Sequence, residues 1–153
     1  MPQNKKENKI RKLRITIITT LIMLLASVVY AQTRTIAVNV TQIDVEKGGK
    51  VKIGIYDAKG FPVVGKEIAG IDIKVKKASI THVFKNIPAG KYAIAVFQDE
   101  NVDSKLNKNL FGAPKEAYGF SKNIYGMFGP PNFEKVAFDV EKNQKILLTI
   151  NLE

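Results

Sequence analysis

Apolar and polar residues alternate in several short runs of this chain, and this alternation restricts its fold more than any other feature. In residues 35–45, for example, Ile36, Val38 and Val40 share one side while the residues between them share the other. A period of two over this length predicts a half-buried β-strand. Further runs, bounded by polar turns, follow at residues 51–55, 71–76, 79–84, 91–98, 136–140 and 146–152. About seven short strands without a long helix predict an all-β fold, an antiparallel β-sandwich.

The run at residues 91–98 is apolar on both sides, so it predicts a central strand that is covered on each face. The segment that follows, residues 99–133, shows neither strand nor helix periodicity, although it holds four of the chain's eight Phe residues. A long irregular segment in a compact domain is usually functional or disordered, and aromatic content argues against disorder. We therefore expect any function to lie in residues 99–133, the long loop.

The first 31 residues have the pattern of a secretory signal peptide. Six Lys and Arg residues precede an apolar run at residues 15–29, and Val29-Tyr30-Ala31 loosely fits a small-x-small exit. This order predicts export with cleavage after Ala31, which leaves residues 32–153 as one β-sandwich domain. An uncleaved N-terminal membrane anchor is the alternative, although an apolar run of about 15 residues is short for a span of about 20. Membrane contact is expected only in that case.

Composition excludes several kinds of chemistry. The chain has no cysteine and one histidine, His82, which excludes disulfides, a Cys nucleophile and thiolate or multi-histidine metal sites. No acidic or nucleophilic partner can be assigned to His82, so we expect an ordinary polar strand position there. Subtracting the N-terminal block's +5 from the net charge of +10 leaves +5, without a Lys/Arg stripe interleaved with aromatics. We therefore expect no nucleic-acid binding.

The start of the long loop has alternating oxygen-bearing side chains, Asp99, Asn101 and Asp103. Such side chains can converge on one calcium ion in a tight turn. The helix–loop–helix calcium motif needs Gly at the sixth position and Glu at the twelfth, where this chain has Ser104 and Leu110. Two interpretations stay open: a looser calcium site, or a turn in which Asp and Asn side chains bond their own backbone.

Aromatic residues separated by glycines fill the second half of the long loop. The functional interpretation is a ligand platform for a sugar or a peptide, made of Tyr118, Phe120, Tyr125 and Phe128. The other interpretation is that these rings close one open end of the sandwich and form a satellite core. We favour the packed arrangement, because aromatic rings bury large areas and usually serve packing.

An ordered set of short motifs also suggests a family. These motifs are Phe84, Pro88-Ala89-Gly90-Lys91-Tyr92-Ala93-Ile94-Ala95-Val96, Asp99-Glu100-Asn101 with Asp103, Lys105 and Leu106, Gly112, Pro114, Glu116, Tyr118-Gly119-Phe120-Ser121 with Asn123, Phe128-Gly129-Pro130-Pro131 with Phe133, and Ala137-Phe138. The combination resembles the bacterial exported domain-of-unknown-function family 2141, over about residues 36–152. Ser104 and Asn107 stand where the family usually has Gly and Asp, which weakens the calcium interpretation.

The resemblance implies a small exported domain without an established activity, and it transfers no catalytic residue. The Phe-x-x-Ile-Pro-x-Gly-x-Tyr-x-Ile pattern from Phe84 to Ile94 also resembles prealbumin-like sandwich modules of exported proteins, at the level of the fold alone. We expect an immunoglobulin-like or prealbumin-like sandwich. We expect a non-catalytic binding or structural module of a bacterial periplasm or cell surface, which contacts an envelope protein or a glycan through the long loop. Two alternatives stay open: a hydrolase that uses Asp99, Asp103 and Glu116, or a membrane-tethered subunit of an envelope complex.

Overall fold

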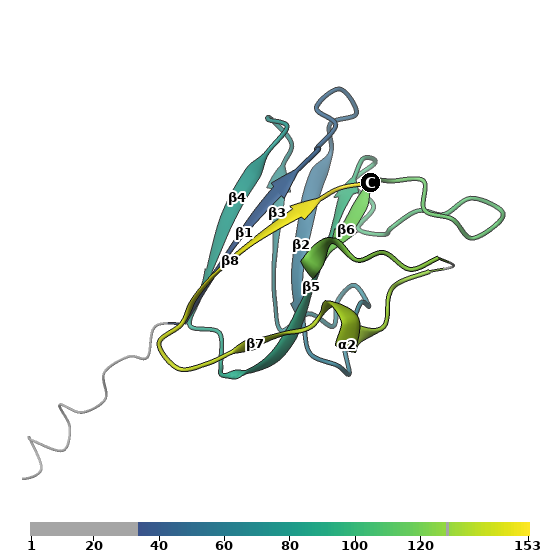
Figure 1. Ribbon diagram of the computed structural model, residues 1–153. Helices are drawn as coiled ribbons and strands as arrows, with labels where there is room; N and C mark the ends of the chain where they lie inside the picture. The colour runs from purple at the N-terminus through teal and green to yellow at the C-terminus, as the bar shows by residue number, and fades with distance from the viewer. Residues whose placement is uncertain (1–33, 128) are drawn as a thin grey trace, which may run out of the picture. The chain divides into compact units, whose positions relative to one another are not determined.

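Two β-sheets pack face to face in the structure, a computed structural model that describes residues 34–127 and 129–153 (Figure 1). The predicted signal peptide at residues 1–31 and Phe128 lie outside the described residues. The strands of the smaller sheet are, in order, β4 (Ile80–Lys85), β1 (Thr35–Thr41) and β8 (Lys145–Asn151). Those of the larger sheet are β3 (Ala69–Lys74), β2 (Lys50–Tyr56), β5 (Gly90–Asp99) and β6 (Tyr118–Phe120), and β7 (Phe138–Val140) pairs with β5.

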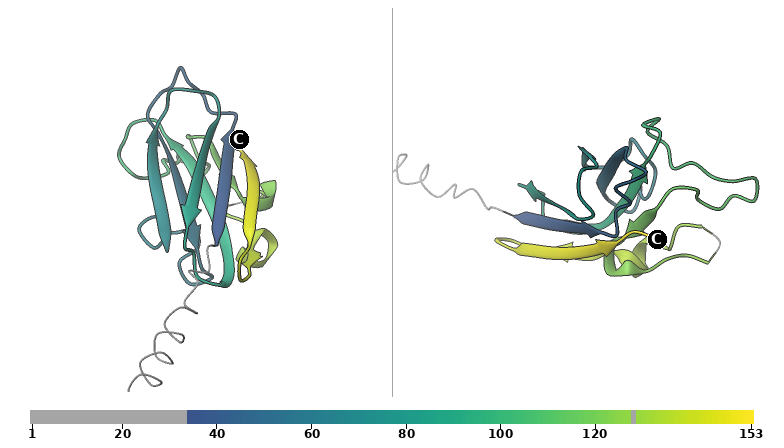
Figure 2. Two further views of the ribbon diagram at one scale, coloured as in Figure 1. Left: turned by 90° about the vertical axis from the view of Figure 1, so that its left-hand side faces the viewer. Right: turned by 90° about the horizontal axis from the view of Figure 1, so that it is seen from above.

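The predicted all-β sandwich is therefore confirmed, with eight strands in the described part of the chain. Every pairing is antiparallel except that of β1 with β8, which is parallel. Figure 2 shows the two sheets as separate layers in the view from above. The prediction that residues 91–98 form a central strand is also confirmed, because β5 pairs with β2, β6 and β7.

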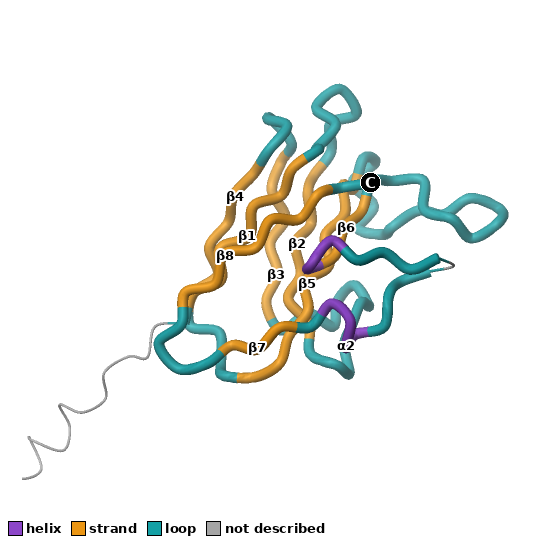
Figure 3. Tube along the Cα trace, in the orientation of Figure 1, coloured by secondary structure: helices purple, strands orange, loops and turns teal. Residues whose placement is uncertain are grey.

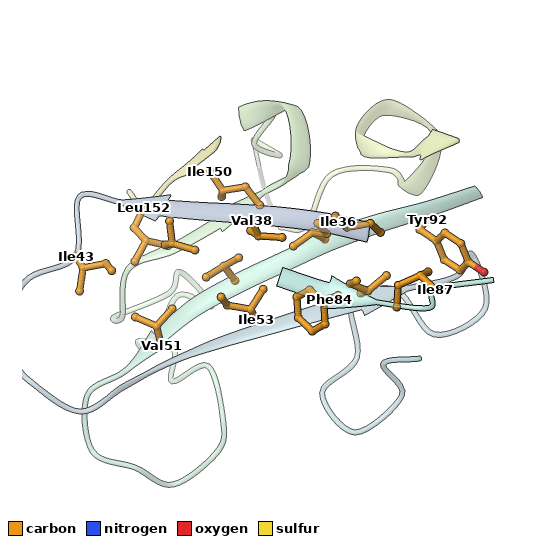
Figure 4. Packing of buried hydrophobic residues seen from close by; sticks show 14 of the residues in the cluster. Ile36, Val38, Ile43, Val51, Ile53, Phe84, Ile87, Tyr92, Ile150 and Leu152 are labelled. Carbon is orange, nitrogen blue, oxygen red and sulfur yellow. The ribbon is translucent and has the colours of Figure 1, made fainter. Parts of the chain in front are cut away.

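The core lies between the two sheets and is made by the predicted alternation (Figure 4). Ile36, Val38 and Val40 of β1 are fully buried, and they face the equally buried Ile53 and Ile94 of the larger sheet. Burying a Val or Ile side chain contributes about 1.5–3 kcal/mol. His82 is half-buried on β4 and its ring packs edge-on against Phe84, so its predicted position as a polar strand residue is confirmed.

The prediction that the long loop contains no strand is wrong at β6. This strand connects the two sheets, because it pairs with β5 and its Tyr118 also exchanges two backbone hydrogen bonds with Glu153 beyond β8. Gly119 permits this position, since a Cβ atom there would lie 2.6 Å from the carbonyl oxygen of Asn151. A glycine at the centre of a three-residue strand gives no alternation from which β6 could be predicted.

Two short helical turns follow β6, and neither was predicted. The first, η1 (Ser121–Asn123), covers the edge of β8, where the Asn123 side chain bonds the backbone of Thr149 and Asn151. The second, α2 (Phe133–Val136), begins after Asn132, whose side chain accepts a hydrogen bond from the Glu134 N–H. The strand predicted from residue 136 therefore begins only at Phe138.

Ser121 connects these turns to the central strand. Its hydroxyl is fully buried, accepts a hydrogen bond from the Ile94 N–H at 3.0 Å, and donates one to the Val136 carbonyl at 2.6 Å. We expect Ser121→Ala to lower the free energy of unfolding by about 1–3 kcal/mol, because both buried backbone groups lose their partner. Urea denaturation measures this loss. Ser79→Ala removes an exposed serine hydroxyl and serves as the control, with a change below about 0.5 kcal/mol.

Candidate binding groove

Small residues form a row across the outer face of the larger sheet. On β2, Val51, Ile53 and Ile55 point into the core, so the residues between them face away from it. Gly54 is paired with Gly70 of β3 and with Ala95 of β5. Small residues in this row leave room above the sheet for larger side chains of the same face, such as the ring of Tyr56 over Gly54.

Two loops turn this face into a groove of about 750 Å³. One wall is the β2–β3 connection, which contributes Pro62, Val64 and Glu67. The other wall comes from the long loop, which contributes Leu106, Lys108 and Pro130. The floor is made by side chains of all four strands: Lys52, Tyr56, Asp72, Ala95, Phe97, Tyr118 and Phe120.

The floor is charged at one end and aromatic at the other. Lys52 and Asp72 are paired across β2 and β3, and the Lys52 Nζ lies 2.7 Å from the Asp72 carboxylate. In the same row, Lys52 is paired with Phe97, which is paired with Tyr118. Only 16% of the Lys52 side chain is exposed, and its ammonium group points at the Asp72 carboxylate.

Tyr56 folds its ring over the glycine row. A Cβ atom at Gly54 would lie 2.7 Å from the Tyr56 hydroxyl, so the glycine makes room for this ring. The pKa of Tyr56 is raised to about 12, first because burial penalises the phenolate and second because Glu67 adds a negative charge nearby. The phenol is therefore neutral and able to donate a hydrogen bond at any physiological pH.

This shift predicts the alkaline behaviour of Tyr56. The pKa of Tyr56 in the folded protein lies above the ordinary value of 10.0. Its contribution to the free energy of unfolding is therefore complete below pH 10 and is lost as the pH rises towards 12. We expect Tyr56→Phe to remove the last tyrosine that ionises in an absorbance titration. Glu67→Gln should move the Tyr56 transition to lower pH, and an unchanged transition would contradict the electrostatic contribution of Glu67.

Three of the four predicted platform residues are described, and they form one packed group. Phe120 is buried, and its ring packs edge-on against those of Phe61 and Tyr118. Tyr118 in turn contacts Tyr125, whose hydroxyl donates a 2.6 Å hydrogen bond to the Asn151 carbonyl. Tyr118 and Phe120 also line the groove, whereas Tyr125 lies outside its lining. Phe128 lies outside the described residues.

Sequence reasoning did not identify several residues of this region. Phe61 comes from the turn after β2 and connects two parts of the aromatic group, since its ring also contacts Phe133. Lys52 and Asp72 were predicted only as outward-facing strand residues. Their pairing depends on the β2–β3 register, and the sole signal for it was a positive residue and a negative residue on adjacent predicted strands.

The side chains predicted as calcium ligands bond the backbone of their own turn. Asp99 is 1% exposed, and its two carboxylate oxygens accept the N–H groups of Asp103 and Ser104 at 3.1 and 2.9 Å. The Asp103 carboxylate accepts the Lys105 N–H and the amide groups of Asn101 and Asn107. A calcium ion would have to share these oxygens with N–H donors, and calcium binding stays a prediction. A thermal melt in calcium and in chelator tests it.

The pKa of Asp103 lies below its ordinary value, chiefly because the side chains of Asn107 and then Asn101 donate hydrogen bonds to the carboxylate.

Among the described residues, no three His, Asp or Glu side chains gather into a group that could hold a metal ion. In the same part of the chain, no helix is long and apolar enough to cross a membrane.

Glu116 closes the base of the long loop. It is 5% exposed, and its carboxylate accepts the Glu100 N–H at 3.0 Å and the Asn107 N–H at 2.8 Å. The Lys115 N–H also donates to the Asn107 carbonyl at 2.8 Å. The outgoing and returning halves of the loop are therefore joined at this residue. The junction lies next to Leu106, which belongs to the groove wall.

We expect Glu116→Gln to loosen this base. A glutamine amide presents one N–H₂ group to a backbone N–H, so one buried donor loses its acceptor at a cost of about 1–3 kcal/mol. Hydrogen exchange should accelerate at the Glu100 and Asn107 amides. Glu134→Gln, at an exposed ion pair with Lys91, is the control and should leave these amides unchanged.

The fold and groove define a small β-sandwich protein with a concave outer face beside a long, structured loop. The family model described as "Uncharacterized protein conserved in bacteria (DUF2141)" matches residues 38–147. The chain therefore belongs to this family, as its motifs predicted. Comparison with curated proteins and with solved structures gives no match.

Proposed function

We propose that this protein is an exported, non-catalytic module that binds a segment of a bacterial surface glycan in the groove. The observation that carries the proposal is the groove itself, whose floor combines aromatic rings with the Lys52–Asp72 pair. Rings pack against the apolar faces of sugars, and charged side chains bond their hydroxyl groups. Export rests on the predicted signal peptide at residues 1–31.

The position of the groove favours a glycan over a peptide. The groove lies on the face of the sheet, where β2 and β5 already use their backbone groups in the ladders with their neighbours. A bound peptide would find few partners there for its own N–H and C=O groups, and unsatisfied backbone groups are costly. Sugar hydroxyls need only side-chain partners, which Lys52, Asp72 and Glu67 supply.

The use of the acidic residues supports a non-catalytic role. A glycoside hydrolase needs two carboxyl groups that face the substrate at a defined separation. Asp99 and Glu116 are instead buried, and all four of their oxygens accept backbone N–H groups of the long loop. Their arrangement accounts for the shape of the loop. The two carboxylates that line the groove are also engaged by other groups, Asp72 by Lys52 and Glu67 by the Gly65 N–H.

Filling the groove tests this proposal. Ala95 lies in the floor between Gly54 and Phe120, so Ala95→Leu should obstruct a ligand without removing a polar contact. We expect wild-type protein to bind members of an array of bacterial surface oligosaccharides, and Ala95→Leu to weaken the bound ones at least about tenfold in calorimetry.

Ala37→Leu is the matched control, because Ala37 lies at the centre of a strand on the outer face of the other sheet. It should bind as wild type does. Absence of binding to every oligosaccharide at millimolar concentration would refute the proposal, as would equal binding by Ala95→Leu. Capture of extended peptides in a parallel array, with no glycan bound, would replace the glycan with a peptide ligand.

A further inference from the structure

Large apolar side chains are fully exposed at the tip of the long loop. Leu110 is 101% exposed and Phe111 is 95% exposed, although most aromatic residues of the same loop are packed. Met127, from the second half of the loop, is 88% exposed. Figure 1 and Figure 3 show the two segments extending from the same side of the sheets.

The first tip is a formed turn. The side-chain oxygen of Asn109 accepts hydrogen bonds from the N–H groups of Phe111 and Ala113, at 2.9 and 3.0 Å. The Asn109 N–H donates to the Ala113 carbonyl, and Gly112 takes the positive φ of +81° that the turn needs. A β-bridge between Lys108 and Pro114 closes the turn behind this point. The backbone that carries Leu110 and Phe111 is therefore held by specific hydrogen bonds.

The two tips border one cleft. Phe111 and Met127 both line this cleft of about 300 Å³, together with Leu106, Pro114 and Pro130. Leu110 precedes Phe111 in the same turn and lies outside the lining of the cleft. We call the three exposed residues Leu110, Phe111 and Met127 the apolar tip.

Lysines outnumber acidic residues among the exposed charged side chains of this part of the chain. Within residues 103–127 the exposed charged side chains are Lys105, Lys108, Lys115 and Lys122, against Asp103, whose carboxylate accepts the Lys105 N–H. The other acidic residue of that segment, Glu116, is buried and bonded to the backbone. An apolar projection surrounded by lysines complements a surface that has negative charge outside and hydrocarbon beneath it.

We propose that the apolar tip inserts into the interface of an anionic lipid bilayer and that the surrounding lysines bind the headgroups. The cationic surroundings favour this partner over an apolar protein surface, which would leave the lysine charges without opposing groups. The site differs from the groove on the sheet face. It also needs no N-terminal anchor, because the apolar and electrostatic contributions act together in weak interfacial binding.

The chain contains no tryptophan, so a single introduced tryptophan reports on its own position. Phe111→Trp in the full chain should show a blue shift of emission when vesicles of phosphatidylglycerol and phosphatidylcholine are added. Phosphatidylcholine alone should give little shift, and 1 M salt should reverse the effect, because the Debye length falls to about 3 Å. Lipids brominated near the headgroup should quench the same tryptophan. This signal reports insertion of the tip even if residues 1–31 also contact the bilayer.

Leu147→Trp is the matched control, since Leu147 is 74% exposed on the outer face of the smaller sheet. Its emission should not shift. Lys105→Gln and Lys115→Gln, in the Phe111→Trp background, should each lower the partition coefficient about fivefold. Lys142→Gln should not, because Lys142 belongs to the β7–β8 connection, which Figure 1 shows on the side opposite to the long loop. Unchanged emission of Phe111→Trp with anionic vesicles would overturn the proposal. Equal shifts for both tryptophan variants, or for both kinds of vesicle, would overturn it as well.

Discussion

The last two residues of β5 are buried polar side chains, and the arrangement of both neighbouring loops depends on them. Gln98 is fully buried on the core side, where its amide bonds the backbone of Asp44 and Gly48 in the β1–β2 loop. Asp99 is buried on the other side and bonds the backbone of Asp103 and Ser104. Buried polar groups are stable only when their partners are in place, so the two loops are held in defined positions.

The groove depends on this arrangement. Asp99 fixes the turn that follows β5, and Glu116 then joins the returning segment of the loop to the outgoing one. Leu106 and Lys108 lie between these two fixed points and form the groove wall. On the other side, Ser121 attaches the end of β6 to the backbone of β5. A loop of this length can therefore present a fixed surface without regular secondary structure of its own.

Sequence periodicity predicted the parts of the fold that depend on local pattern. The core positions of β1, β2 and β5 followed from alternation, and the central place of β5 followed from its two apolar faces. The parallel pairing of β1 with β8 joins residues more than a hundred positions apart, so no local pattern specifies it. Strand β6 was missed because it is held by its neighbours on both sides rather than by its own alternation.

The groove was missed for a related reason. Gly54, Gly70 and Ala95 are unremarkable in sequence, and they form a floor only because the strand registers align them. The long loop was identified as the place of interest because of its aromatic residues. Those residues proved to be mostly packing groups, while the charged floor residues lie on β2 and β3, outside the loop.

The aromatic residues of the long loop are either packed or fully exposed, and this contrast sets the apolar tip apart. Phe120 and Phe133 belong to the packed aromatic group, so this part of the fold can bury its large rings. Phe111 lies outside that group, and Asn109 fixes the turn that carries it through both its side chain and its backbone. Contiguous exposed apolar residues lower solubility unless a partner covers them. Because Lys108 borders both the groove and the tip cleft, a tip held at a lipid surface would bring the groove close to that surface. The two proposals are therefore compatible, since one orientation at the lipid surface leaves both the tip and the groove close to it.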